Sequence, residues 1–147
     1  MAKQTTYEMR IVKTGSVKEP ISGEKKITSP EEIVEWALPW RSQPQEHFVC
    51  YSLDGAGHII ASRVITIGLL NHSLVHPRET FRGAISDNAA SIICAHNHPS
   101  GSLEPSSQDI AITRQLRDAG SILGIPLVDH VIVTKTGHYS MKEHGVI

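Results

Sequence analysis

Short runs of apolar residues, some alternating with polar ones and some continuous, predict the strands of this chain. The expected strands occupy 7–15, 48–53, 58–67 and 91–96, with two more on either side of Thr136-Gly137 within 125–141. Residues 54–57, Asp-Gly-Ala-Gly, form turns readily and are expected to close a hairpin. The run 91–96 is too short and too apolar for a surface helix, so it predicts a central strand buried on both faces. Residues 69–75 are ambiguous, and a short strand is one interpretation.

Apolar residues at helical spacing predict three helices, within 29–38, 76–90 and 106–124. The first has a clear start, because Ser29 can cap it, Pro30 fits the first helical position and Glu32 completes a capping box. Pro39 is expected to end it. The inner faces are expected at Ile33, Trp36 and Ala37, then at Phe81, Ala84 and Ile85, and in the third helix at Ile110, Thr113, Leu116 and Ala119.

The interleaving of helices with strands predicts an α/β (α+β) fold, in which a central mixed β-sheet carries helices packed on it. A chain of 147 residues fits one domain, and a domain of this length can bury a full core. Residues 1–28 are expected to form an N-terminal strand and a polar connector, and residues 29–147 the part that carries the chemistry.

The charges nearly cancel, since 14 Lys and Arg against 15 Asp and Glu leave a net charge of -1. Such a chain has no overall positive field to attract nucleic acid or an anionic membrane, so a nucleic-acid role would need a local basic patch. Cys50 and Cys94 lie in apolar runs, which predicts buried thiols and a reducing, cytoplasmic setting. No apolar stretch reaches the length of a membrane span, so no membrane partner is expected.

Two of the nine histidines stand at the end of the predicted buried strand. His96 and His98 are two residues apart, so their side chains project to the same side. A Pro and Gly turn then reverses the chain, and Ser106 or Ser107 begins a helix that carries Asp109 in its first turn. Two imidazoles and one carboxylate suit zinc and leave a fourth tetrahedral position for water, as in catalytic sites. Each residue alone has an ordinary explanation, but together they predict a metal site.

The segment HNHPSGSLEPSSQD, 96–109, resembles the JAMM (MPN+) metalloprotease motif. The segments HPRETFRGAI, AHNHPSG, PSSQDIAIT and AGSILGIPLVDHVIV more closely resemble the RadC family. The resemblance runs from about Ser29 to Gly145 and implies that 29–147 form a JAMM/MPN-like domain with a cytidine-deaminase-like architecture. Full-length RadC-like chains begin with a helix-hairpin-helix segment that reads the DNA backbone. Nothing before Ser29 resembles one, so the short, JAMM-only form is expected.

The resemblance implies one Zn²⁺ per chain, held by His96, His98 and Asp109. It also implies a glutamate from an earlier strand that accepts a proton from the metal-bound water, and Glu46 matches that position. Because zinc lowers the pKa of water toward neutrality, a nearby carboxylate can take this proton and return it to a leaving amine. Ser106 matches the motif serine, which could steady the developing oxyanion and also cap its helix.

Several roles stay open at this point. Glu79 is the rival base, although it has a ready role as an acid in the first turn of a helix. Asp129 or His130 could orient a zinc histidine, or the two could form a satisfied interior pair. Cys94 shares a face with His96, but a thiol buried in an apolar strand is expected to be inert.

The expected function is that of a zinc-dependent hydrolase of the metallopeptidase or isopeptidase type, acting on a peptide or protein. One alternative is a non-catalytic metal-binding module associated with DNA repair or mobile-element maintenance, and another is a metal-dependent nuclease. A zinc nucleoside deaminase is disfavoured, because its site needs His-x-Glu and a later Pro-Cys-x-x-Cys. The oligomeric state is open, a dimer included.

Overall fold

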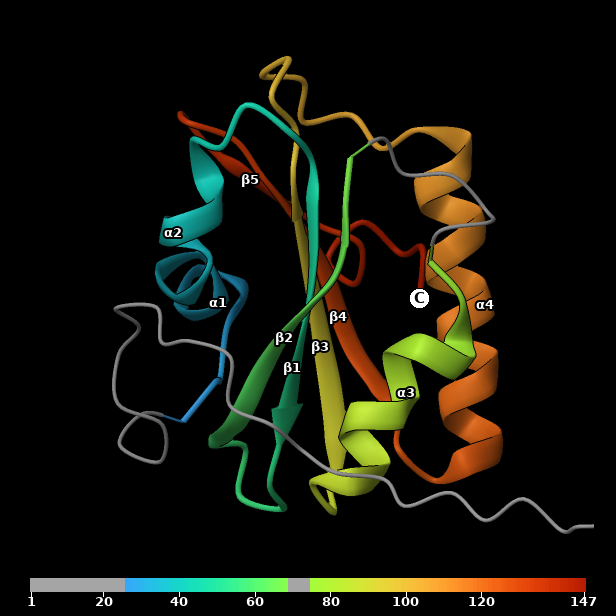
Figure 1. Cartoon of the computed structure of the whole chain (residues 1–147). Helices are drawn as coiled ribbons and strands as arrows, with labels where there is room; N and C mark the ends of the chain where they lie inside the picture. Colours follow the sequence, from blue (N-terminus) through green and yellow to red (C-terminus); the bar gives the residue numbers. More distant parts are fainter. Residues whose placement is uncertain (1–25, 69–74) are drawn as a thin grey trace, which may run out of the picture.

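The computed structural model describes residues 26–68 and 75–147 of the chain (Figure 1). The expected strand at 7–15, nearly all of the connector and residues 69–74 lie outside this part. The helices are α1 (Pro30–Trp36), α2 (Leu38–Arg41), α3 (Pro77–Ser86) and α4 (Ser107–Leu123). The strands are β1 (His47–Leu53), β2 (Ile59–Ile67), β3 (Ser91–Asn97), β4 (Leu127–Val133) and β5 (His138–Ser140). None of the described helices has both the length and the apolar character needed to cross a membrane.

The five strands form one mixed sheet in the order β2-β1-β3-β4-β5. β1 runs antiparallel to β2 and to β3, β3 runs parallel to β4, and β4 runs antiparallel to β5. This confirms the predicted mixed sheet, with the apolar strand β3 at its centre. Because β3 and β4 are parallel neighbours, their carboxyl ends lie side by side at the same end of the sheet. Open α/β sheets place their ligand sites beyond the carboxyl ends of their strands.

Helices cover both faces of the sheet, α1 and α2 on one side and α3 and α4 on the other (Figure 1). The core on the α3 and α4 side includes Phe48, Phe81, Ile92, Ile112 and Leu116, all buried. The core on the α1 side includes Ile33, Trp36, Tyr51, Ile93 and Val131. Successive residues of β3 therefore enter different cores, as the alternation of side chains along a strand requires.

Two details of the predicted helices are wrong. Pro39 does not end the first helix, since α1 ends at Trp36 and the short helix α2 begins directly afterwards with Pro39 in its first turn. Proline is tolerated there because the first N–H groups of a helix have no partner inside it. Ile85 is 53% exposed, because α3 buries the stripe formed by Thr80, Phe81 and Ala84 instead.

The inner face of α4 agrees with the prediction at Thr113 and Leu116, which are buried, whereas Ile110 is only half-buried. The far end of this helix is held against the strand that follows it. A Cβ atom at Gly120 would lie 2.6 Å from the carbonyl oxygen of Ile125, closer than real Cβ atoms approach. Glycine is therefore required at this position for α4 to pack against the start of β4.

Candidate metal centre

The residues expected to hold a metal come together at the carboxyl end of β3. His96 is the last but one residue of this strand, His98 follows the strand, and Asp109 lies in the first turn of α4. The two Nε2 atoms are 2.8 Å apart. Oδ1 of Asp109 lies 3.4 Å from Nε2 of His96, and Oδ2 lies 3.3 Å from Nε2 of His98. All three side chains are at least nine-tenths buried, so they form a compact polar group at the edge of an apolar core.

The ring proton of His98 is placed by its other nitrogen. Nδ1 of His98 lies 2.7 Å from the carbonyl oxygen of Ser102. A carbonyl oxygen can only accept a hydrogen bond, so Nδ1 carries the proton and Nε2 keeps a lone pair. The lone pair belongs to the nitrogen that faces Asp109 and His96.

A chain of hydrogen bonds gives the same result for His96. The hydroxyl of Thr113 donates to the backbone carbonyl of Asp109 at 2.6 Å, and its oxygen also lies 2.6 Å from Nδ1 of His130. One hydroxyl has one proton, so Oγ1 must accept from Nδ1 of His130. Nε2 of His130 is then an acceptor, and it lies 2.6 Å from Nδ1 of His96. His96 therefore carries its proton on Nδ1 and presents the Nε2 lone pair to the site.

Two lone pairs and a carboxylate that face one another repel unless a cation lies between them. Ligand atoms about 2.0–2.1 Å from a tetrahedral zinc ion lie roughly 3.3–3.4 Å apart. Each histidine lies at about this distance from one oxygen of Asp109, His96 from Oδ1 and His98 from Oδ2, and the separation of the two imidazoles is somewhat shorter. His96, His98 and Asp109 can therefore hold a metal ion as three convergent ligands.

The electrostatics of the group favour positive charge. Burial alone would raise the pKa of Asp109, but each imidazole that faces it can bind a proton at Nε2 in place of a metal ion and then donate to the carboxylate, which lowers this pKa well below its usual value, so the carboxylate stays ionised. Burial opposes protonation of His98, yet hydrogen bonds with Asp109 and with the Ser102 carbonyl raise its pKa. Burial is the main cause that lowers the pKa of His130 well below its usual value, so this ring stays neutral.

A cavity of about 270 Å³ opens beside these three residues, and we call it the metal-side cavity. Its lining includes His98, Asp109, Ser106 and Glu46. Glu46 is half-buried and directly precedes β1, and its charge contributes to the raised pKa of His98. The structure thus places Glu46 at the open side of the candidate metal site.

Asn97 fixes the segment that carries Glu46. This residue stands between the two histidines but points to the other side of β3, and it is fully buried. Its side-chain oxygen accepts from the backbone N–H of His47 at 2.6 Å, and its amide nitrogen donates to the carbonyls of Gln45 and Gln43 at 3.0 and 3.3 Å. The chain on both sides of Glu46 is therefore tied to the strand that carries the histidines.

Ser106 caps α4, as expected. Its Oγ accepts from the backbone N–H of Asp109 at 3.0 Å, and its own N–H donates to the Asp109 carboxylate at 2.8 Å. This capping box orients Asp109 toward the histidines. Because Oγ acts as an acceptor in the cap, its hydroxyl proton remains for a group in the metal-side cavity.

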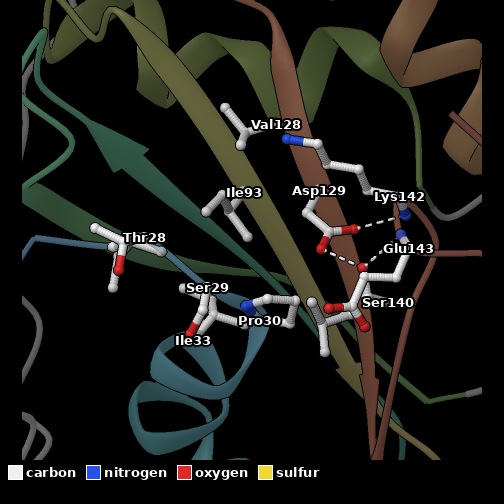
Figure 2. A pocket seen from close by; sticks show the side chains of 12 residues that line it. Thr28, Ser29, Pro30, Ile33, Ile93, Val128, Asp129, Ser140, Lys142 and Glu143 are labelled. Atoms are coloured by element: carbon white, nitrogen blue, oxygen red, sulfur yellow. Dashed lines mark hydrogen bonds between the residues drawn. The ribbon is translucent and has the colours of Figure 1, made fainter.

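The other candidates lie elsewhere. Glu79 is 59% exposed in the first turn of α3, 3.7 Å from Arg82, and does not line the metal-side cavity. Asp129 lies on the α1 face of the sheet, where its carboxylate accepts from Ser140 Oγ at 2.6 Å and from the N–H of Lys142 at 3.1 Å (Figure 2). It lines a separate cavity of about 390 Å³ there. Of the pair 129–130, only His130 touches a candidate ligand.

The structure adds Asn97 and Thr113 to the residues around the site. The motif predicts neither of them. Thr113 belongs to the expected inner face of its helix, and Asn97 stands between the two histidines with no role of its own in the motif. One signal was available for Asn97, because a polar amide inside a strand buried on both faces needs partners. Cys94 is fully buried and its pKa is raised, first of all by burial, which agrees with an inert thiol.

Comparison with known proteins agrees with this geometry. The RadC-like JAB domain family matches residues 27–146. A UPF0758 protein of Methanospirillum hungatei is 53% identical over 124 residues, which cover 83% of this chain and 55% of that protein. UPF0758 proteins of Shouchella clausii and Listeria monocytogenes are 48% and 46% identical over 120 residues, covering 81% of this chain and 52% and 54% of theirs.

The chain spans about half the length of these curated relatives. The match to the family nevertheless covers β1 to β5, all four helices and the candidate ligands. The fold, a mixed five-stranded sheet with helices on both faces, is consistent with a JAB/MPN domain. The chain therefore belongs to the RadC-like JAB domain family.

Proposed function

We propose that this chain is a zinc-dependent hydrolase that cleaves a peptide or isopeptide bond. The observation that carries the proposal is the convergence of two imidazole lone pairs and an ionised carboxylate beside a cavity lined by Glu46. Membership of the JAB domain family supports it, because that family includes metalloproteases.

His96, His98 and Asp109 would hold the ion beside the metal-side cavity. Bound zinc would supply a Lewis acid that lowers the pKa of a coordinated water toward neutrality. The neutral ring of His130 holds His96 in the tautomer that can bind a metal, which is the usual task of a hydrogen-bond partner behind a metal ligand.

Glu46 would act as the general base. Its carboxylate lines the cavity in which the water and the scissile bond would lie, so it can accept a proton from water and deliver it to the leaving amine. Ser106 lines the same cavity and can donate its hydroxyl proton to the carbonyl oxygen as negative charge develops there. Asn97 keeps Glu46 at a fixed position relative to the histidines.

The test combines metal content with turnover of a library of internally quenched peptides. Protein purified without a metal-affinity tag is offered zinc, dialysed and subjected to elemental analysis as wild type, His98→Ala and Glu46→Gln. We expect about one zinc per chain in wild type and in Glu46→Gln, loss of zinc in His98→Ala, and turnover only in wild type. Glu79→Gln is the matched control, because it neutralises the rival glutamate, and it should keep both zinc and turnover.

Two outcomes would contradict the proposal. Wild type that stays free of zinc would show that the three residues do not form a zinc site. Peptide cleavage that survives both His98→Ala and Glu46→Gln would show that this site does not carry the activity.

A further inference from the structure

A third cavity, of about 370 Å³, also has His98 in its lining. Residues 41–44, 98–101 and 135–136 line it, so three connections meet there: the end of α2, the turn after β3 and the loop after β4. It shares His98 and Ser100 with the metal-side cavity. We call it the cationic cavity, because its charged lining residues, apart from His98, are Arg41 and Lys135.

Arg41 is held in place by the backbone rather than by an acid. Its Nε donates to the carbonyl oxygen of Thr134, the residue before Lys135. Within residues 26–68 and 75–147, no carboxylate lies within ion-pair distance of Arg41 or Lys135. The Nε bond leaves the two Nη groups of the guanidinium, which carry four of its five N–H donors, for a ligand.

The two cavities have opposite charge. The metal-side cavity contains the carboxylates of Glu46, Glu104 and Asp109, whereas the cationic cavity contains no carboxylate. A substrate bound across His98 with its scissile bond in the metal-side cavity would place neighbouring groups against Arg41 and Lys135. Arginine with fixed Nε and free Nη donors suits a planar carboxylate, which it can bind with two parallel hydrogen bonds.

We propose that the cationic cavity binds a carboxylate of the substrate close to the scissile bond. The inference rests on the proposed peptidase function and specifies its substrate: a peptide with either a free C-terminus or an acidic side chain at this place. A nucleic-acid strand fits less well, because binding a phosphate backbone relies on several cations along its path and the chain as a whole carries a net charge of -1.

The test measures binding separately from cleavage. Zinc-loaded protein labelled with ¹⁵N is titrated at moderate salt with acetyl-Gly-Gly-Gly as free acid and as C-terminal amide. A second pair, acetyl-Gly-Asp-Gly-amide and acetyl-Gly-Asn-Gly-amide, distinguishes a side-chain carboxylate from a chain end. The reporters are the Nε–H of Arg41 and the backbone amides of Lys135 and Thr136. We expect at least one acidic peptide to bind about tenfold more tightly than its neutral partner, as a partly exposed charge-assisted hydrogen bond would give.

Lys135→Gln and Arg41→Gln should each reduce this preference. Lys135→Gln is the safer variant, because Lys135 is exposed, whereas Arg41 is half-buried and bonded to the backbone of Thr134. Lys142→Gln is the matched control, since Lys142 is also exposed but lines the cavity on the α1 face. It should leave the preference unchanged, and zinc content should be the same in all three variants.

The outcomes separate this inference from the proposed function. A carboxylate preference that depends on Arg41 and Lys135 supports the cationic cavity even if no peptide is cleaved. Equal binding of acid and neutral peptides, or a preference that Lys135→Gln and Arg41→Gln leave intact, overturns the inference, and a peptidase activity dependent on Glu46 would still stand. Shifts at the same reporters with an eight-nucleotide thymidine oligomer, stronger than with any peptide, would also overturn it.

Discussion

Nδ1 of His96 lies 2.6 Å from Nε2 of His130, so a ring on β4 sets the protonation of a ring on β3. His130 is fully buried, and its own orientation depends on the hydroxyl of Thr113 on α4. Three elements of the fold thus cooperate to leave one nitrogen lone pair pointing at the candidate metal site. Packing of the core therefore determines which nitrogen of His96 is presented to the candidate metal site.

Thr113→Val should therefore weaken zinc binding. The change leaves the Nδ1 proton of His130 without an acceptor in a buried place and releases the constraint on His96. We expect the zinc dissociation constant to rise about tenfold to hundredfold, as for other groups behind metal ligands. Competition with a chromophoric chelator measures it.

Thr80→Val is the matched control for that experiment. Thr80 is also a buried helical threonine whose hydroxyl donates to the carbonyl four residues earlier, but it lies on α3 and contacts no candidate ligand. An equal loss of zinc affinity in Thr80→Val and Thr113→Val would show that the effect is a general loss of stability.

Asn97→Ser should lower turnover without removing zinc. The shorter side chain cannot reach the backbone groups of Gln43, Gln45 and His47, so the segment that carries Glu46 loosens. A displacement of about 1 Å at a catalytic group can reduce the rate about a hundredfold. Steady-state kinetics should show the loss in kcat, with zinc content near that of wild type. Gln45→Ala serves as control, because Asn97 bonds the backbone of Gln45 and the Gln45 side chain lines neither the metal-side cavity nor the cationic cavity. A comparable fall in kcat there would argue against a role of Asn97 in holding Glu46.

Ser106→Ala should affect stability and turnover together. Loss of the cap costs about 1 kcal/mol in the free energy of unfolding. Loss of a hydrogen-bond donor to the developing oxyanion should reduce kcat about a hundredfold, in addition to any reduction that follows from loss of the cap. Ser106→Thr retains a hydroxyl and should recover most of both, whereas Ser107→Ala, one residue along, should change neither. If Ser106→Ala loses stability but keeps its kcat, Ser106 is a cap only.

Asp87→Asn should make stability less dependent on pH. The Asp87 carboxylate pairs with the Arg63 guanidinium, and Oδ1 lies 2.6 Å from Nη2. Burial opposes ionisation of Asp87, but hydrogen bonds with Arg63 and Ser52 lower its pKa below the ordinary value. The folded pKa is thus below the unfolded one, so the pair stabilises the fold above the unfolded pKa and this contribution is lost as pH falls through the folded pKa.

We expect Asp87→Asn to cost about 1 kcal/mol at neutral pH, a value reduced because the pair is partly open to solvent. The difference from wild type should shrink once the pH falls below about 4. Urea unfolding at pH 7 and pH 3 measures both. Asp118→Asn is the control, since Asp118 is 66% exposed and pairs with its neighbour Arg117. A pH effect of the same size in both variants would contradict the role assigned to Asp87.

The sequence predicts the parts of this structure that are local. Capping boxes at Ser29 and Ser106 mark the starts of two helices in the sequence. The convergence of the two histidines with Asp109 follows from a strand end, a turn and a helix start within 96–109. The groups behind the site could not be found in this way. Asn97 meets Gln43, and His96 meets His130, only because β1 and β4 both pair with β3. Which of Asp129 and His130 lies behind the candidate ligand His96 depends on the register of β4 against β3, which no local pattern specifies.

Contacts near both ends of α4 restrict insertions and deletions within this helix. Asp109 must face the histidines at the first turn, and Gly120 must face the carbonyl of Ile125 near the last. Each helical residue advances the direction of the side chain by about 100°. An insertion or deletion of one residue between these two positions would turn one end away from its contact. The spacing between the aspartate and the glycine is therefore fixed by the fold, while the solvent-facing residues between them are free to vary.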